Sequence, residues 1–151
     1  MGKIKTLVKI ATTAGPAVYS IVRTYGPQIR RIMKENPELF ETMKNRVSAL
    51  AGAGSSKRGT AKLKARVGVL REQTTYLYGT ANNAMVAEQA TAWRKELDLL
   101  ENSLPVVATM KGKTRRGKIR ELESRIDDLA AKILAMTLQD DIEDAEIVEE
   151  K

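Results

Sequence analysis

The side chains of this chain that could do chemistry are mainly cations, and the densest group lies at residues 111–120. Six cations occur in these ten residues, and no acidic residue lies between Glu101 and Glu121. The six are Lys111, Lys113, Arg115, Arg116, Lys118 and Arg120. Such a group can bind phosphates by charge and by release of their counterions. The alternative interpretation is a solvated loop that only aids solubility.

A second basic group precedes it, and we assign four of its residues to the same candidate anion site. They are Lys57, Arg58, Lys62 and Arg66. Tyr76 and Tyr78 follow, and exposed aromatic rings can stack on bases. Aromatic residues at helical spacing are more often packing residues, so this second interpretation stays open. Together the two groups predict an anionic polymer as partner, and nucleic acid is the polymer that we expect.

Residues 1–35 form a basic amphipathic arm in which the first acidic residue is Glu35. The candidate membrane-surface cations of the arm are Lys3, Lys5, Lys9, Arg23, Arg30 and Arg31, whereas Leu7 lies on the apolar face. Gly-Pro pairs at 15–16 and 26–27 predict short helices or one kinked helix. As an alternative to nucleic acid, this arm could lie in the headgroup region of an anionic membrane.

Catalysis and metal binding have little support in the sequence. Cysteine and histidine are both absent, which removes disulfides, most zinc sites and the usual nucleophile and base pairs. The adjacent acids Asp127-Asp128 and Asp140-Asp141 point about 100° apart on a helix, so we interpret them as solvated charges. We therefore expect a protein that is not an enzyme and that needs no metal, no cofactor and no small-molecule substrate.

The elements that must position these residues follow from apolar spacing by threes and fours, which is typical of helices that pack lengthwise. It predicts helices at about 37–50, 61–104 and 118–138. The second of these is the long central helix, and we expect it to stay continuous, although distorted, near Gly79. Its second half and the third helix present matching seams, Val86, Trp93, Leu97, Leu100 and Leu104 on one and Ile119, Leu122, Ile126, Leu129 and Ile133 on the other.

The predicted fold is therefore all-α, with elongated antiparallel hairpins or a coiled-coil-like bundle around one central helix. The basic arm is residues 1–35, the bundle is residues 36–138, and residues 139–151 form an acidic tail that we expect to be disordered. One seam per helix should leave apolar surface for a protein partner or a second copy. Charge is uneven too, since residues 1–120 hold 23 Lys and Arg against eight Asp and Glu.

Three functions follow from these features. The first is a helical adaptor that binds nucleic acid, the second is a peripheral membrane protein that uses residues 3–34, and the third is a scaffold or assembly subunit. A cytoplasmic location is expected, at the nucleoid for the first function or at the inner membrane surface for the second.

Overall fold

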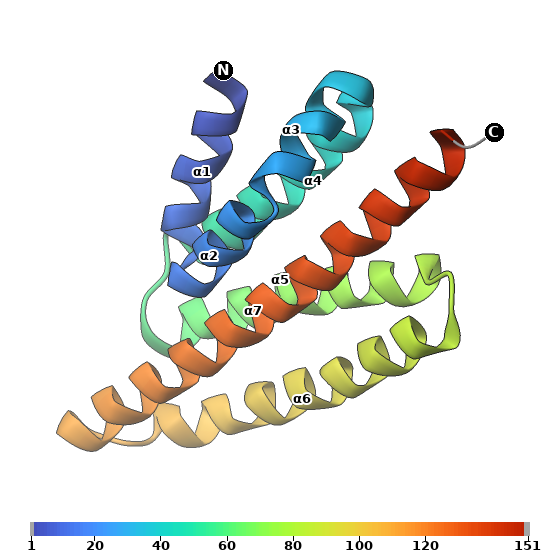
Figure 1. The fold of residues 1–151 in the computed structure, drawn as a ribbon. Coiled ribbons are helices and arrows are strands. Elements are labelled where there is room, and N and C mark those ends of the chain that lie inside the picture. Colours follow the sequence, from blue (N-terminus) through green and yellow to red (C-terminus); the bar gives the residue numbers. More distant parts are fainter. Residues whose placement is uncertain (1, 150–151) are drawn as a thin grey trace.

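The computed structural model describes residues 2–149, which form seven α-helices and no strand (Figure 1). This confirms the predicted all-α class. The helices are α1 (Gly2–Ala14), α2 (Pro16–Thr24), α3 (Gly26–Glu35), α4 (Pro37–Gly52), α5 (Gly59–Thr80), α6 (Ala84–Ala108) and α7 (Gly112–Glu149).

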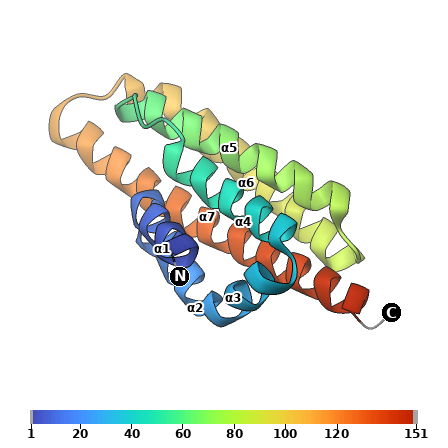
Figure 2. The ribbon, with the colours of Figure 1, turned by 90° about the horizontal axis from the view of Figure 1, so that it is seen from above.

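The prediction of one continuous helix over 61–104 is wrong, because the chain reverses between α5 and α6. Ala81 and Asn83 are both extended, and the Asn83 side chain accepts a hydrogen bond from the Val86 amide at 3.0 Å. Asparagine competes with the helical backbone in this way and is a preferred N-cap. The reversal lays α6 antiparallel on α5, so that the two apolar seams cover each other (Figures 1 and 2).

The last helix is longer than predicted at both ends. It begins at Gly112, and residues 139–149 continue it instead of forming a disordered tail. Leu134 and Leu138 are buried near the predicted end of the helix, and Ile142 continues the buried stripe beyond residue 138. Burial of that stripe outweighs the acidic composition that favoured disorder. The part of the predicted tail at 150–151 lies outside the described residues.

The N-terminal segment is part of the core and not a separate arm. The chain breaks close to the predicted positions, at Gly15 between α1 and α2 and at Tyr25 between α2 and α3. Asn36 caps α4 by accepting a hydrogen bond from the Leu39 amide at 3.2 Å. The apolar faces of these helices are buried through Leu7, Ala11, Val18, Val22, Ile29 and Ile32. They pack on α4 and on α7, because only there can their apolar sides leave water.

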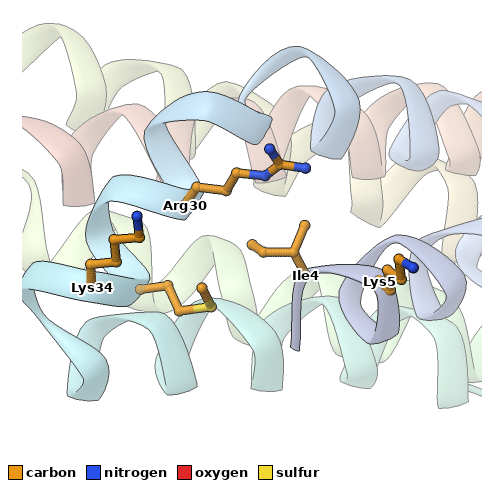
Figure 3. A pocket seen from close by; sticks show the side chains of 5 residues that line it. Ile4, Lys5, Arg30 and Lys34 are labelled. Atoms are coloured by element: carbon orange, nitrogen blue, oxygen red, sulfur yellow. The ribbon is translucent and has the colours of Figure 1, made fainter. Parts of the chain in front are cut away.

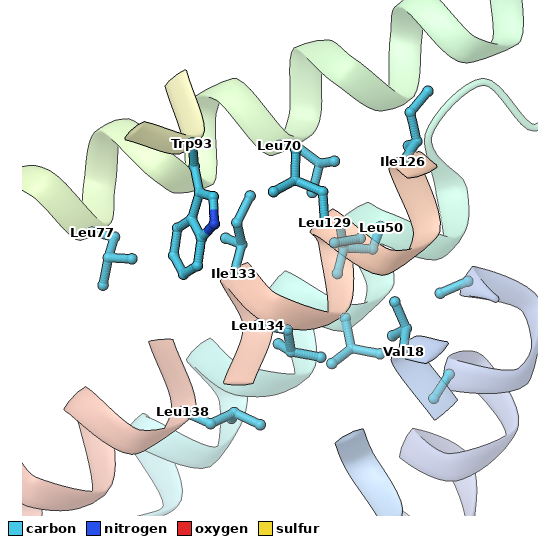
Figure 4. Packing of buried hydrophobic residues seen from close by; sticks show 14 of the residues in the cluster. Val18, Leu50, Leu70, Leu77, Trp93, Ile126, Leu129, Ile133, Leu134 and Leu138 are labelled. Carbon is cyan, nitrogen blue, oxygen red and sulfur yellow. The ribbon is translucent and has the colours of Figure 1, made fainter. Parts of the chain in front are cut away.

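The central element is α7, which contacts each helix from α2 to α6. Its Ile133 lies beside Trp93 of α6, whereas Leu134 lies on the side of Val18 of α2 (Figure 4). The helix therefore buries two faces, one against the pair α5 and α6 and the other against the N-terminal helices. The segment predicted to be the central helix, residues 61–104, forms α5 and α6. These two antiparallel helices cover one face of α7.

Candidate anion-binding end

The reversal at 81–83 brings the two basic groups to the same end of the molecule. Helix α5 has 22 residues and α6 has 25, so each runs roughly 33–38 Å and the second returns nearly to the start of the first. The connection from α4 to α5 and the connection from α6 to α7 consequently lie at one end (Figures 1 and 2).

A side-chain contact joins the two groups. A Cβ atom placed on Gly59, the first residue of α5, would lie 3.6 Å from Nη2 of Arg115. Arg115 therefore reaches from α7 to the start of α5, next to Lys57 and Arg58. We call the resulting surface the basic end, and it comprises Lys57, Arg58, Lys62, Lys111, Lys113, Arg115, Arg116, Lys118 and Arg120.

The N-terminus of α5 adds partial positive charge to the basic end. No side chain caps this terminus, and Arg58 occupies the cap position with an extended backbone. The first amides of a helix have no partner within it and favour an anion. Among the nine cations, eight are exposed and Arg115 is half-buried. The arrangement suits an extended anion that contacts many cations weakly, not a small substrate in a pocket.

One described ion pair reduces the charge of the basic end. Nζ of Lys118 lies 3.2 Å from Oε2 of Glu121, and both side chains are about half exposed. Exposed pairs of this kind contribute about 0–1 kcal/mol, so a phosphate can compete for the lysine. The basic end therefore keeps most of its positive charge.

Arg66, which was predicted with the same basic group, makes a contact within the protein. It is half-buried, and its Nη2 donates a hydrogen bond to the carbonyl oxygen of Ala14 at 3.2 Å. The guanidinium thus binds the C-terminal end of α1, where carbonyl groups lack helical partners. Arg66 therefore ties α5 to α1, and we do not count it in the basic end.

The tyrosines are also far from the basic end. Tyr76 lies 17 residues after Gly59 on the same helix, which is roughly 26 Å along the axis. The guanidinium of Arg46 lies 4.6 Å from the centroid of the Tyr76 ring. Base stacking by Tyr76 is therefore not combined with the basic end, and one face of that ring already packs on a cation.

Arg71, next along α5, is likewise committed to a structural role. It donates hydrogen bonds to Asp98 and Glu101 of α6. The hydrogen bond to Asp98 raises the pKa of the Arg71 guanidinium above its ordinary value, against a smaller opposing effect of burial. These bonds hold α5 to α6 behind the basic end.

The membrane interpretation of residues 3–34 conflicts with the packing. Lys5, Lys9, Arg23, Arg30 and Arg31 are exposed, but the apolar residue assigned with them, Leu7, is 1% exposed. An interfacial helix must present its apolar face to lipid, and here that face is in the protein core. The Lys3 side chain lies outside the described residues. In the described part of the chain, no helix combines the length and the apolarity needed to cross a bilayer.

The seams that were predicted to seek a partner are closed within one chain. Nine of their ten residues are buried, and Ile119 is partly buried against the same core. Exposed large apolar side chains occur elsewhere, at Leu99 and Val106 of α6, which are 65% and 59% exposed. With Met110 they line a hollow of about 410 Å³ between α6 and α7. Seam spacing could not reveal them, because they lie off the seam.

The interpretation of Asp140 and Asp141 as solvated charges is wrong, because both are buried. Sequence reasoning thereby missed an ion pair that joins α4 to the end of α7. Arg46 donates a hydrogen bond to Asp141, and each side chain is about nine-tenths buried. Burial raises the pKa of Asp141 above its ordinary value even though the Arg46 guanidinium opposes that change. The two residues are 95 positions apart, so no local spacing rule could pair them.

Comparison with known proteins identified no relative of this chain. No family model, no curated protein and no solved structure matches this chain. Among the side chains that the structure describes, which exclude those of residues 145–151, no group of three or more acidic side chains is placed to hold a metal ion. The candidate function therefore depends on the geometry of the chain itself.

Proposed function

We propose that the protein is a non-enzymatic helical adaptor that binds a polyanion at its basic end, and that this polyanion is nucleic acid. The observation that carries the proposal is the approach of Arg115 to Gly59, which joins two basic groups separated by about fifty residues. Nine cations on one surface match the closely spaced charges of a phosphate backbone. The proposed place of action is the cytoplasm, at the nucleoid.

The proposed contacts are to phosphates and not to base edges. The cations belong to two connections and two helix starts, and no aromatic side chain of the described chain lies among them. Contacts of this kind position a protein on nucleic acid without reading its sequence. We therefore expect little preference between sequences and a strong dependence of affinity on salt.

The test is the salt dependence of affinity for a fluorescent duplex oligonucleotide, measured by anisotropy. The logarithm of the association constant should fall linearly with the logarithm of salt concentration, with a slope of about −0.9 for each phosphate that is neutralised. K113Q/R116Q and K57Q/R58Q should each reduce the magnitude of that slope by about 2. Equal losses from both pairs would support one shared surface.

The control is R94Q/K95Q, which removes two exposed cations from α6 outside the basic end. It lowers the net charge by the same amount, so it should leave the slope nearly unchanged. Affinity that ignores ionic strength, or an equal loss in the control, would contradict the proposal. Binding that depends on only one of the two basic pairs would contradict the shared surface.

A second candidate function is that of an assembly subunit, favoured by the exposed Leu99 and Val106. We infer that the hollow they line receives a side chain from a second copy of the protein, and that the pair α5 and α6 packs as a coiled-coil-like hairpin. The native mass of the wild type should then exceed that of L99S/V106S in light scattering. A monomer at high concentration for both proteins would contradict this function.

A further inference from the structure

Two adjoining hollows form a groove on the N-terminal helices. One, of about 250 Å³, lies between α1 and α3. The other, of about 600 Å³, is bounded by α1, α2 and α3. Ile4 and Arg30 line both hollows, so the two lie side by side. Ligand pockets have volumes of about 300–1,000 Å³, and the groove is of that size.

The walls of the groove are apolar. Ile4 and Val8 contribute from α1, Val22 from α2 and Met33 from α3. Val22 is buried, whereas the other three are partly exposed to the groove. Figure 3 shows Ile4 pointing from α1 into the space beneath Arg30. A hydrocarbon chain placed there would leave water where it contacts these walls, which is favourable.

The rim of the groove is cationic. Arg30 and Lys34 stand one turn apart on α3, Lys5 lies opposite on α1, and Arg23 lies on α2 (Figure 3 shows the first three). No acidic side chain of the described residues lines either hollow. Arg23 rests on the Tyr19 ring, 5.9 Å from its centroid. Arginine and lysine together give charge-assisted hydrogen bonds to a carboxylate.

We propose that this groove binds a single-chain anionic lipid, namely a free fatty acid. Its hydrocarbon chain lies along Ile4, Val8 and Val22, and its carboxylate binds Arg30 and Lys34. A neutral apolar ligand would leave the four rim cations without a counter-charge. A nucleic-acid phosphate would pair with those cations but would leave the apolar walls uncovered.

The inference goes beyond the proposed function and does not depend on it. None of the groove residues belongs to the basic end, so variants of one site leave the other intact. The structure also distinguishes this inference from membrane anchoring, because the groove receives one chain while Leu7 and its neighbours stay in the core. Sequence reasoning overlooked Lys34, although its spacing of four from Arg30 places both on one helix face.

The experiment is calorimetric titration of the full chain with sodium dodecanoate below its micelle concentration. We expect one molecule bound per chain. R30Q/K34Q should weaken binding at least tenfold, because both rim cations of α3 are lost. I4S should also weaken it while all cations remain. R94Q/K95Q, with the same change in net charge, should bind dodecanoate like the wild type.

Two further ligands separate the contributions of charge and chain. Acetate carries the carboxylate without the chain, and dodecanol carries the chain without the charge, so each should bind at least tenfold more weakly than dodecanoate. Equal binding of dodecanol would overturn the role of the rim, and equal binding of acetate would overturn the role of the walls. Circular dichroism of each variant confirms that its helices remain folded.

Other occupants give other results, and each would overturn the proposal. Binding to vesicles of anionic phospholipid without binding of monomeric dodecanoate would identify a membrane surface as the partner. A native mass that falls from dimer to monomer in R30Q/K34Q, without any ligand, would identify a second copy. K113Q/R116Q should lose oligonucleotide binding but bind dodecanoate like the wild type. The two proposals can therefore fail separately.

Discussion

The contact between Gly15 and Asp127 holds the N-terminal helices on α7 and gives a sharp test of the packing. Gly15 precedes α2 with a φ of 140°, and no side chain of its own segment caps that helix. Oδ2 of Asp127, from α7, accepts a hydrogen bond from the Ala17 amide at 3.1 Å. Asp127 therefore acts as an N-cap supplied from another helix, and it is 8% exposed.

Replacement of Asp127 by alanine removes both the cap and the charge near the start of α2. Loss of an N-cap costs about 0.5–2 kcal/mol, and a partly buried charge at a helix end contributes up to about 2 kcal/mol. We therefore expect D127A to lower the free energy of unfolding by about 1–3 kcal/mol. The control is D128A, which removes an exposed carboxylate from the adjacent position and should change that free energy by less than about 0.5 kcal/mol.

Replacement of Gly15 by alanine should cost more, for two separable reasons. A side chain at this φ is strained by about 1–3 kcal/mol. The new Cβ would also lie 2.0 Å from Oδ1 of Asp127, so the carboxylate must move and the cap is lost. Without the Asp127 carboxylate, only the strain remains. G15A should therefore cost about 1–3 kcal/mol less in a D127A background than in the wild type.

Urea unfolding of the four proteins, followed by circular dichroism, measures this coupling. The slope of the free energy against urea should stay constant across the set, because the helices unfold together. Additive losses, within about 0.5 kcal/mol, would refute the contact between Gly15 and Asp127. A loss in D128A equal to that in D127A would refute the assignment of the cap to Asp127.

Three further predictions concern α7 and the turn before α6. Burial raises the pKa of Asp140 above its ordinary value of 3.8, so the folded protein loses stability as pH rises through that raised pKa. D140N should therefore be more stable than the wild type at pH 7, and this gain should vanish below pH 3.8 in urea titrations. R46M leaves Asp141 buried without its cation and should cost about 3–5 kcal/mol in thermal or urea unfolding at pH 7, and D141L in the same chain should recover most of that loss. N83A removes the cap of α6 and should lower the free energy of unfolding by about 1 kcal/mol, whereas an unchanged value would contradict the assigned cap.

Apolar spacing predicted which side chains are buried better than it predicted where helices end. Leu97, Leu100, Ile126 and Leu129 are all buried, as the seam pattern required. Burial follows from spacing because a helix with one apolar face is stable only when that face is covered. The spacing shifts register between Ala84 and Val86, but a shift of this kind is compatible with a distorted continuous helix as well as with a reversal.

The candidate site depends on that reversal, which is why the sequence could indicate the basic groups but not their union. If residues 61–104 formed one continuous helix, Lys62 would lie at its start, roughly 63 Å from the far end. The connection that carries Lys111 follows that far end. The turn at 81–83 brings them to one end instead. The signal was present in the paired asparagines 82 and 83, because asparagine favours caps over helix interiors.

The polarity of α7 bears on how the protein would sit on a polyanion. Its 38 residues begin within the basic end and continue to Glu149, so its two ends lie roughly 57 Å apart. Of the charged residues from 121 to 151, three are Lys or Arg and eleven are Asp or Glu. The Debye length is about 8 Å at physiological ionic strength, so the acidic half cannot cancel the field of the basic end. An acidic tail folded back on that surface would compete with a ligand, but residues 139–149 extend α7 away from it. If the basic end binds a polyanion as proposed, the charge separation orients the protein, with the basic end toward the polyanion and the acidic half repelled from it.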